Sequence, residues 1–368
     1  MEFITKELQS AVSKLKPLIK TRTPLEVAKG ILYANGNMTA TDMTVHATIK
    51  VSTGLVPTDE TFIIPQDAFN AIAKLPDEKA TIEYDANGYI SVVSGKFKAK
   101  FATYNPFEFP AFESKADVLV TKQINLSGFM RNLKSVMYAV AVSENKGVMC
   151  GINIVSDGKR IKFAALDGFR AAMAFGEECA DQFTVTVPVG FWTMMMKATT
   201  DDTETATLTV LSDNKSLSLA NENFTIQTRL LEGQFVDVDA IIAKVNQTKT
   251  IRVDRLELIS ALEMHAASMK DNGKNNLIVF TVDSVSSVLL SAHTQGSSFE
   301  YVLSAENEGF SSVFKIGFNA TYIMQAIKAL DCDTLLFKLD SPVTATLIFD
   351  AGDIDSHTAL VLPVRINE

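Results

Sequence analysis

The stretch that decides the fold is IRVDRLELISALEMHAASM, residues 251–269. It begins with a short apolar, β-branched entry and continues into a segment whose apolar residues recur every three or four positions. Those residues are Leu258, Leu262, Ala266 and Met269. This spacing is typical of an amphipathic α-helix with one buried face. The stretch therefore predicts a strand that leads directly into a helix.

The same arrangement occurs six times along the chain. Its copies begin at Phe3, Phe62, Ile124, Phe183, Ile251 and Phe314. In the first copy the apolar stripe runs through Leu8, Val12, Leu15 and Ile19. The spacing of the copies is roughly 60 residues, a regular period of the kind that marks internal repeats. We expect six copies of one unit made of a helix and strands.

Strand-like material with turn signals follows each predicted helix. In ATIEYDANGYISVVSG, for example, Ala86-Asn87-Gly88 predicts a hairpin turn between two alternating runs. Helices with one apolar stripe and antiparallel meanders suit an α+β fold with the helices on one face of the sheets. Because one unit alone would bury too little surface, we expect the units to pair into three similar domains. The predicted domains are residues 1–121, 122–248 and 249–368.

Composition restricts the class of protein. The chain has 368 residues, of which 47% are hydrophobic and 21% charged, so neither disorder nor a fibrous repeat is indicated. The beginning, MEFITKELQ, lacks the apolar run of a signal peptide, and no stretch approaches the roughly eighteen apolar residues of a membrane span. We therefore expect a cytoplasmic protein. The three cysteines (Cys150, Cys179 and Cys332) are too scattered for a disulfide framework or a zinc site.

Charge is distributed unevenly along the chain. The net charge is −9, yet the six predicted helices hold eleven basic and five acidic residues. Candidate contacts to nucleic acid among the basic residues are Lys14, Lys74, Arg131, Lys134, Lys197 and Lys328. If the helices share one side of the sheets, their charges add into one positive field. Such a surface suits contact with phosphates without any reading of the bases.

Helix spacing constrains a ring lined by these helices. Six helices about 9 Å apart, each about 5 Å in radius, enclose a hole of only about 7 to 9 Å. Twelve helices at the same spacing leave roughly 24 Å, enough for a DNA duplex. A single chain could not enclose DNA, so we expect a head-to-tail homodimer as the smallest closed ring.

Several segments resemble the bacterial sliding clamps, the beta subunits of DNA polymerase III. They are GVMCGINIVSDGKRIKFAALDGFRAAMAF from Gly147, LLEGQFVDVDAII from Leu230, FATYNPFEFP from Phe101, IGFNATYIMQAIKAL from Ile316 and ALVLPVRI from Ala359. Each segment alone is a weak signal. Five in the family's order on a six-unit frame identify the chain as similar to this family over its whole length.

The resemblance implies a non-catalytic ring that is opened on DNA by a separate clamp loader. It also implies a cleft that takes short motifs from the replicative polymerase catalytic subunit and from other replication and repair proteins. Carried over residue by residue, the cleft comprises Met149, Leu166, Gly168, Phe169, Arg170, Ala171, Val236, Ile241, Asn319, Tyr322, Val343, Val361, Leu362, Pro363, Val364, Arg365 and Ile366. Arg22 joins Lys74 and Lys197 near the family's DNA contacts, and the implied dimer contacts are Ala99, Phe101, Ala266 and Ala267.

The chain departs from the family pattern at the implied cleft. Phe169 stands where the family commonly has His, Ala171 where it has Leu, and Ala240 where a basic residue is frequent. These differences bear on which peptide the cleft would prefer. An apolar groove with Arg170 and Arg365 at its rim would accept a hydrophobic peptide and hold its polar ends.

Two alternatives remain open: an enzyme, and a peptide-binding scaffold that does not bind DNA. The four histidines (His46, His265, His293 and His357) show no metal-ligand spacing, and the sequence has no nucleophile-elbow, P-loop or dinucleotide motif. The Asp167-Gly168 dipeptide is more typical of a turn than of an active site. We expect no catalytic residues, no metal and no cofactor.

Overall fold

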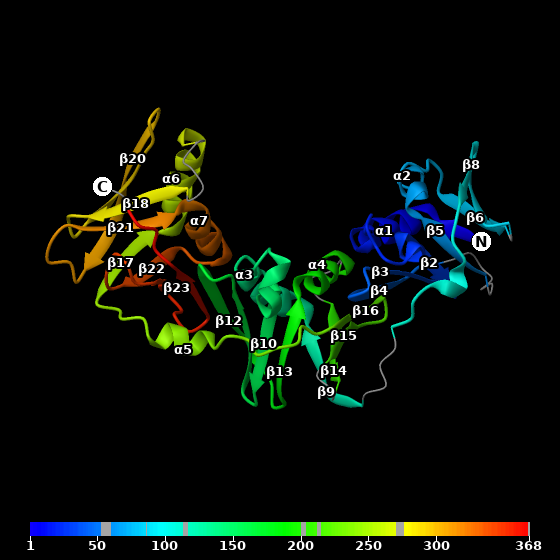
Figure 1. Ribbon diagram of the computed structural model, residues 1–368, viewed down its shortest axis with the longest axis horizontal. Coiled ribbons are helices and arrows are strands. Elements are labelled where there is room, and N and C mark those ends of the chain that lie inside the picture. The colour runs from blue at the N-terminus through cyan, green and yellow to red at the C-terminus, as the bar shows by residue number, and fades with distance from the viewer. Residues whose placement is uncertain are drawn as a thin grey trace. The chain divides into compact units, whose positions relative to one another are not determined.

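The computed structural model describes residues 1–52, 60–85, 87–112, 117–199, 204–211, 215–269 and 276–366. The protein is an α+β structure with antiparallel sheets, as expected (Figure 1). Contacts divide the chain into two compact units: residues 1–127 with 187–231, and residues 128–186 with 232–368. Within the described residues, no helix is long and apolar enough to cross a membrane.

The first unit contains two antiparallel sheets. The smaller has the order β1-β6-β7-β8, with β1 (Glu2–Ile4), β6 (Lys79–Asp85), β7 (Tyr89–Ser94) and β8 (Phe97–Ala102). The larger has the order β5-β2-β3-β4-β16-β15-β14-β9, with β5 (Thr61–Pro65), β2 (Gly30–Ala34), β3 (Asn37–Thr41), β4 (Val45–Lys50), β16 (Phe224–Arg229), β15 (Ser216–Ala220), β14 (Thr205–Leu211) and β9 (Val118–Asn125). Its helices are α1 (Thr5–Leu15), α2 (Phe69–Ile72) and α4 (Val189–Ala198).

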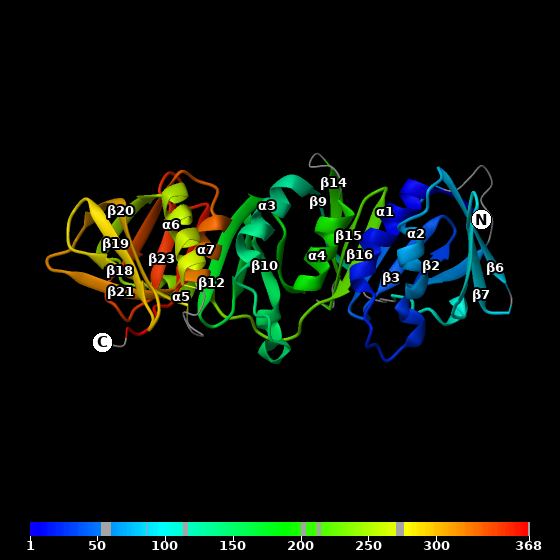
Figure 2. The same ribbon diagram turned by 90° about the horizontal axis from the view of Figure 1, so that it is seen from above.

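The second unit is built on a twelve-stranded sheet. Its order is β13-β10-β11-β12-β24-β23-β22-β17-β20-β19-β18-β21. The strands are β13 (Gln182–Pro188), β10 (Gly151–Asp157), β11 (Arg160–Leu166), β12 (Arg170–Glu178), β24 (His357–Val361), β23 (Thr346–Asp350), β22 (Thr334–Leu339), β17 (Lys249–Asp254), β20 (Ser298–Glu308), β19 (Ser287–His293), β18 (Leu277–Val282) and β21 (Phe314–Asn319). The helices are α3 (Leu126–Met137), α5 (Val238–Ala243), α6 (Arg255–Ser268) and α7 (Ala320–Ala329). Helices α6 and α7 lie side by side (Figures 1 and 2).

Each predicted strand-to-helix entry is present. In residues 251–269 the Asp254 side chain accepts a hydrogen bond of 2.7 Å from the Glu257 backbone N–H, which caps α6. The predicted stripe is confirmed at Leu258, Leu262 and Met269 but is wrong at Ala266, which is exposed. The helix instead buries Ala261 and His265, because a period of 3.6 residues moves a strict four-residue stripe off the buried face.

Two helices differ from their predicted length. The helix near Phe62 is a short 3₁₀ turn followed by the four-residue α2, which ends at Ile72. Pro76 disfavours helical conformation at the preceding residue, and this limits the helix. Helix α1 ends at Leu15, so Ile19 lies beyond it and is half-buried.

The hairpins form as predicted. Strands β6 and β7 pair with Asp85 opposite Tyr89, and Gly88 has φ +82°, a conformation that favours glycine. Of the predicted turn, Ala86 lies outside the described residues. Lys270, one of the eleven basic helix residues, also lies outside them.

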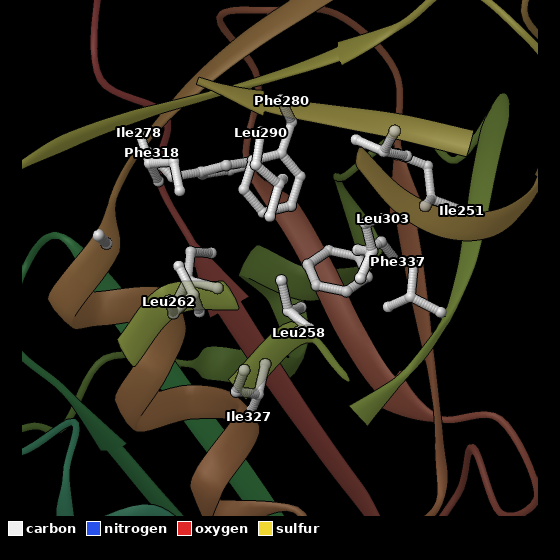
Figure 3. Close-up of a cluster of buried hydrophobic side chains, with 14 of the residues drawn as sticks. Ile251, Leu258, Leu262, Ile278, Phe280, Leu290, Leu303, Phe318, Ile327 and Phe337 are labelled. Carbon is white, nitrogen blue, oxygen red and sulfur yellow. The ribbon is translucent and has the colours of Figure 1, made fainter. Parts of the chain in front are cut away.

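The core of the second unit packs α6 and α7 against the sheet (Figure 3). We call it the helix-covered core; its buried residues include Leu258, Leu262, Ile278, Phe280, Leu290, Ile327 and Phe337. The rings of Phe280 and Phe318 meet edge to face at 5.3 Å. Burying one such side chain contributes about 1.5 to 3 kcal/mol, so this core is a main source of stability.

Candidate functional site

Three neighbouring strands of the second unit are apolar on both faces. Along β22, Leu335 and Phe337 enter the helix-covered core, whereas Leu336 between them belongs to a separate buried cluster. In β23 the same alternation places Ile348 in the core and Leu347 and Phe349 in the other cluster. The side chains of β24 alternate between the two clusters in the same way. Because successive side chains of a strand point to opposite faces, the two clusters lie on opposite sides of one sheet.

We call this second group the opposite-face cluster. Its buried members are Ala164, Leu166, Ala171, Met173, Val238, Leu336, Leu347, Phe349 and Leu360. Strand β12 supplies Ala171, which pairs with Leu360 of β24. The cover on this face comes from the six-residue helix α5 and its flanks, which place Phe235, Ile241 and Val245 against the cluster. The predicted cleft residues Met149, Leu166, Ala171 and Ile241 therefore meet in one place.

Apolar side chains remain exposed around this cluster. Phe169 is 56% exposed, Leu362 40% and Val343 77%. The backbone N–H of Leu362 donates to the carbonyl of Phe169 at 2.9 Å, and the ring of Phe169 lies 6.3 Å from that of Tyr322. Val361, by contrast, is fully buried in the helix-covered core. Exposed apolar residues beside a thinly covered apolar cluster are typical of a binding surface.

Arg170 supports this surface from inside. It is 8% exposed, and its Nε donates to Asp167 Oδ2 at 2.9 Å. A second guanidinium nitrogen donates to Gln325 of α7. The guanidinium also lies over two rings, 4.4 Å from the centroid of Tyr322 and 5.4 Å from that of Tyr138. Arg170 is thus a buried brace and not the exposed rim group that the sequence suggested, and burial raises the pKa of Tyr138.

The Asp167-Gly168 dipeptide forms a turn, as predicted. Asp167 Oδ1 accepts hydrogen bonds from the backbone N–H groups of Phe169 and Arg170, at 2.9 and 3.1 Å. Gly168 has φ +94°, which few other residues adopt. The carboxylate is fully used in this turn and in its ion pair with Arg170. Its geometry is that of a structural turn, which presents Phe169 at the surface.

The C-terminal segment that contains Val364 lies beside β21 and near the start of α7 in the same unit. The Val364 N–H donates to the carbonyl of Gly317 at 2.8 Å, and a Cβ on Gly317 would come within 2.7 Å of the Val364 oxygen. Asn319 caps α7 by accepting from the N–H groups of Thr321 and Tyr322. Of the other predicted residues, Arg365 is exposed, whereas Pro363 and Ile366 are half-buried.

The predicted phosphate contacts fall in both units. In the first unit, Arg22, Lys74 and Lys197 are exposed. Lys14 is half-buried, and its Nζ donates to the carbonyl of Ala198 at 3.1 Å, at the end of α4. In the second unit the exposed basic residues are Arg131, Lys134 and Lys328. Lys328 pairs with Glu263 at 2.9 Å, which lowers the net positive charge at that point.

The predicted dimer contacts are Ala99, Phe101, Ala266 and Ala267. Strand β8 is the last strand of its sheet, and the half-buried Ala99 and Phe101 alternate with the exposed Lys98 and Lys100. Ala266 and Ala267 are exposed near the end of α6. An edge strand offers backbone groups to which another strand can pair.

The histidines lie in separate surroundings. Burial lowers the pKa of His46, of His265 and, to about 4, of His357, whose Nε2 lies 3.0 Å from the carbonyl of Ser135. In the part of the chain that the structure describes, no group of three or more His, Cys, Asp or Glu side chains is placed to hold a metal ion. The buried histidines are neutral at pH 7 and sit within packed interiors.

Sequence reasoning from the residues alone did not single out two features of this site. Arg170 contacts Gln325, which lies in α7, and Tyr138, which directly follows α3. Nothing local in the sequence marks either residue. Helix α5 was also missed, although Asp237 caps it by accepting from the Ala240 N–H at 3.0 Å. The continuous apolar runs LLF in β22 and LIF in β23 were a usable signal, because strands covered on both faces lose their alternation.

Comparison with known proteins gives one consistent result. The family model described as DNA polymerase III beta subunit, central domain, matches residues 123–237, and that of the C-terminal domain matches residues 242–365. A beta sliding clamp of Synechocystis is 26% identical over 323 residues, covering 80% of this chain and 79% of the relative. That of Staphylococcus aureus is 24% identical over 298 residues, with 80% and 77% covered.

Solved structures agree on the fold. A putative DNA polymerase III beta subunit from Eubacterium rectale superposes with a TM-score of 0.88 at 18% identity, covering 100% of this chain and 99% of the other. A sliding clamp from Pseudomonas aeruginosa bound to griselimycin gives 0.88 at 19% identity, with the same coverage. The beta subunit from Thermotoga maritima gives 0.87 at 18% identity, again with the same coverage.

Proposed function

Because this chain belongs to the family of bacterial DNA polymerase III beta subunits, we propose that it is a sliding clamp that encircles duplex DNA without reading its sequence. The observation that carries the proposal is the match of two consecutive family domains over residues 123–237 and 242–365. The protein is a non-catalytic processivity factor: it keeps a polymerase on its template by holding both. Its affinity for DNA rests on phosphates, so it falls as salt rises.

The ring is a head-to-tail homodimer of three-domain chains. Each chain contributes the predicted domains 1–121, 122–248 and 249–368. The edge strand β8 supports this arrangement, with Lys98 and Lys100 exposed beside Ala99 and Phe101. On the other side of the contact, α6 offers Ala266 and Ala267, and β20 exposes Glu300, which is opposite in charge to the lysines. A clamp loader opens and closes this ring on DNA in the cytoplasm.

Partner proteins bind at the opposite-face cluster. The replicative polymerase catalytic subunit, the clamp loader and other proteins each insert a short hydrophobic motif there. Support comes from the apolar floor of Leu166, Ala171 and Leu360 and from the exposed Phe169 and Leu362 beside it. A shallow apolar groove with a few fixed polar groups suits a linear peptide.

The decisive experiment compares circular with linear DNA. Clamps assembled by a loader on nicked circular duplex should stay bound through gel filtration and should be lost once the circle is cut, because a ring slides off an end. The mass in solution should be that of a dimer. Reversal of Lys14, Arg22, Lys134 and Lys197 to Glu should weaken retention on the circle.

The second candidate, a scaffold that binds peptides but not DNA, predicts a different result. It would be lost equally from circular and linear duplex while still binding a hydrophobic peptide. Exposed basic residues on α3 and α4, Lys134 and Lys197 among them, favour the clamp. A stable monomer that is never retained on circular DNA would overturn the proposed function.

A further inference from the structure

A pocket lies in the first unit between helix α1 and the end of helix α4. It has a volume of about 590 Å³. Its walls come from α1, from the end of β4, from the last residue of α4 and from the start of β16. Three lysines line it: Lys6 and Lys14 from α1, and Lys50 from β4. Three cationic side chains from two elements thus converge on one hollow.

Among the described residues that line the pocket, three lysines outnumber two carboxylates, so its net charge is positive. Its two carboxylates are Glu7, whose Oε2 accepts from the Ser52 N–H at 2.8 Å, and Glu204, whose Oε2 accepts from Asn221 Nδ2 at 3.3 Å. Within the described residues, Lys14 Nζ uses one of its three donors, on the carbonyl of Ala198. Burial lowers the pKa of Lys14 by more than the nearby carboxylate of Glu204 raises it, so the charged form of Lys14 would gain from a further anionic partner. The hydroxyl of Ser10 adds a neutral donor.

A second pocket occupies the equivalent position in the second unit, and its charge is reversed. It has a volume of about 270 Å³ and is built from α3, β12, the end of α7 and the start of β24. The two sets of elements correspond, since β4 pairs with β16 as β12 pairs with β24. This pocket contains one cation, Arg131, against Asp331, Asp350 and Asp353. Its His357 is neutral at pH 7 because burial lowers the pKa to about 4.

We propose that the lysine pocket of the first unit holds backbone phosphates of the encircled duplex, whereas the aspartate pocket of the second unit repels them. The inference rests on the proposed function and refines it: within one chain, DNA contact is concentrated at the junction of the first two predicted domains. Lysine acts here as a point charge with rotatable donors, which suits phosphates that pass by as the ring slides. Arg131, one of the predicted phosphate contacts, then contributes little because three aspartates line the same pocket.

The test uses paired charge changes that leave the Lys14 hydrogen bond intact. The variant Lys6→Gln with Lys50→Gln removes two charges from the pocket. Its matched control is Lys159→Gln with Lys315→Gln, which removes two charges from exposed sites outside the pocket. A third variant, Lys6→Arg with Lys50→Arg, keeps the charge. The readout is the anisotropy of a labelled short duplex titrated with the full-length dimer at several salt concentrations.

The pocket variant should bind the duplex about tenfold more weakly at low salt, and its logarithmic salt slope should fall by about 1 to 2, as expected for two lost phosphate contacts. The control and the arginine variant should stay near the unaltered protein. Conversely, Asp331→Asn with Asp353→Asn should tighten binding by a few-fold. Equal losses for the pocket variant and the control would overturn the inference while leaving the clamp function standing. Absence of retention on circular DNA would instead remove the function itself.

Discussion

Strands β22, β23 and β24 have two apolar faces that are covered to different extents. One face is closed by α6 and α7 and forms the helix-covered core. The other is covered by the short α5, its flanks and a few partly buried side chains such as Met149, and the exposed Phe169, Val343 and Leu362 remain beside it. The same strands thus stabilise the fold on one side and, on the other, support the surface at which we propose that partners bind. The difference shows that coverage, and not hydrophobicity alone, separates a closed core from a partly exposed apolar surface.

The largest expected effect lies on the closed face. Phe337→Ala should lower the free energy of unfolding by about 3 to 5 kcal/mol, because a buried ring leaves a cavity that the packed helices cannot fill. Leu336→Ala, one residue away on the other face, should cost about 2 kcal/mol, near the low end for leucine, because its thinner cover can relax. Urea denaturation measures both. A greater loss for Leu336→Ala would reverse the assignment of the closed face.

The pH dependence of stability tests the burial of the residue that begins β24, a strand with side chains on both apolar faces. His357 begins β24, and its pKa is lowered to about 4 by burial, against an ordinary value near 6.5. Since the unfolded chain takes up the proton first, stability should be full above about pH 6.5 and fall as pH drops toward 4, by up to about 3 kcal/mol. Denaturation midpoints over this range measure the loss. In His357→Phe this part of the pH dependence should vanish; an unchanged profile would assign it to other groups.

The smallest expected effect is a difference between two residues that are adjacent in sequence, Leu362 and Val361. Leu362→Ala should change stability by less than about 1 kcal/mol yet weaken a short hydrophobic peptide about tenfold, or about 1.4 kcal/mol of binding. Val361→Ala, next to it but buried in the helix-covered core, should destabilise the protein and leave the peptide affinity of the folded molecule unchanged. Fluorescence titration with the peptide gives both affinities. If the two variants lost peptide affinity equally, the site would not be separate from the core.

Much of the fold could be predicted from local patterns. The stripe of Leu258 and Leu262 placed α6, and the Asn87-Gly88 dipeptide placed a hairpin, because both signals depend on neighbours in sequence. Ala266 was misplaced, since a helix drifts relative to a fixed four-residue step. The domain boundaries at residues 121 and 248 stay predictions.

The candidate site was harder to predict. Arg170 looked like a rim cation, and only the packing of Tyr138, Gln325 and Tyr322 around it reveals a buried brace. These partners are distant in sequence, and no periodicity relates them. The contrast between the two charged pockets was equally hidden, because Lys50 and Asp353 lie on strand ends and loops outside the helices whose charges were counted.

Two apolar faces also leave strand register poorly specified. A slip of one residue normally turns polar side chains into a core, and that penalty fixes the pairing. In β23 a slip would merely exchange Leu347 and Phe349 for Ile348. The loops must therefore set the alignment. The Ser341 N–H donates to Thr344 Oγ1 at 3.0 Å at one end of β23, and the Gly352 N–H donates to Asp350 Oδ1 at 2.7 Å at the other. These two hydrogen bonds flank β23 and help to fix which of its side chains face the helix-covered core.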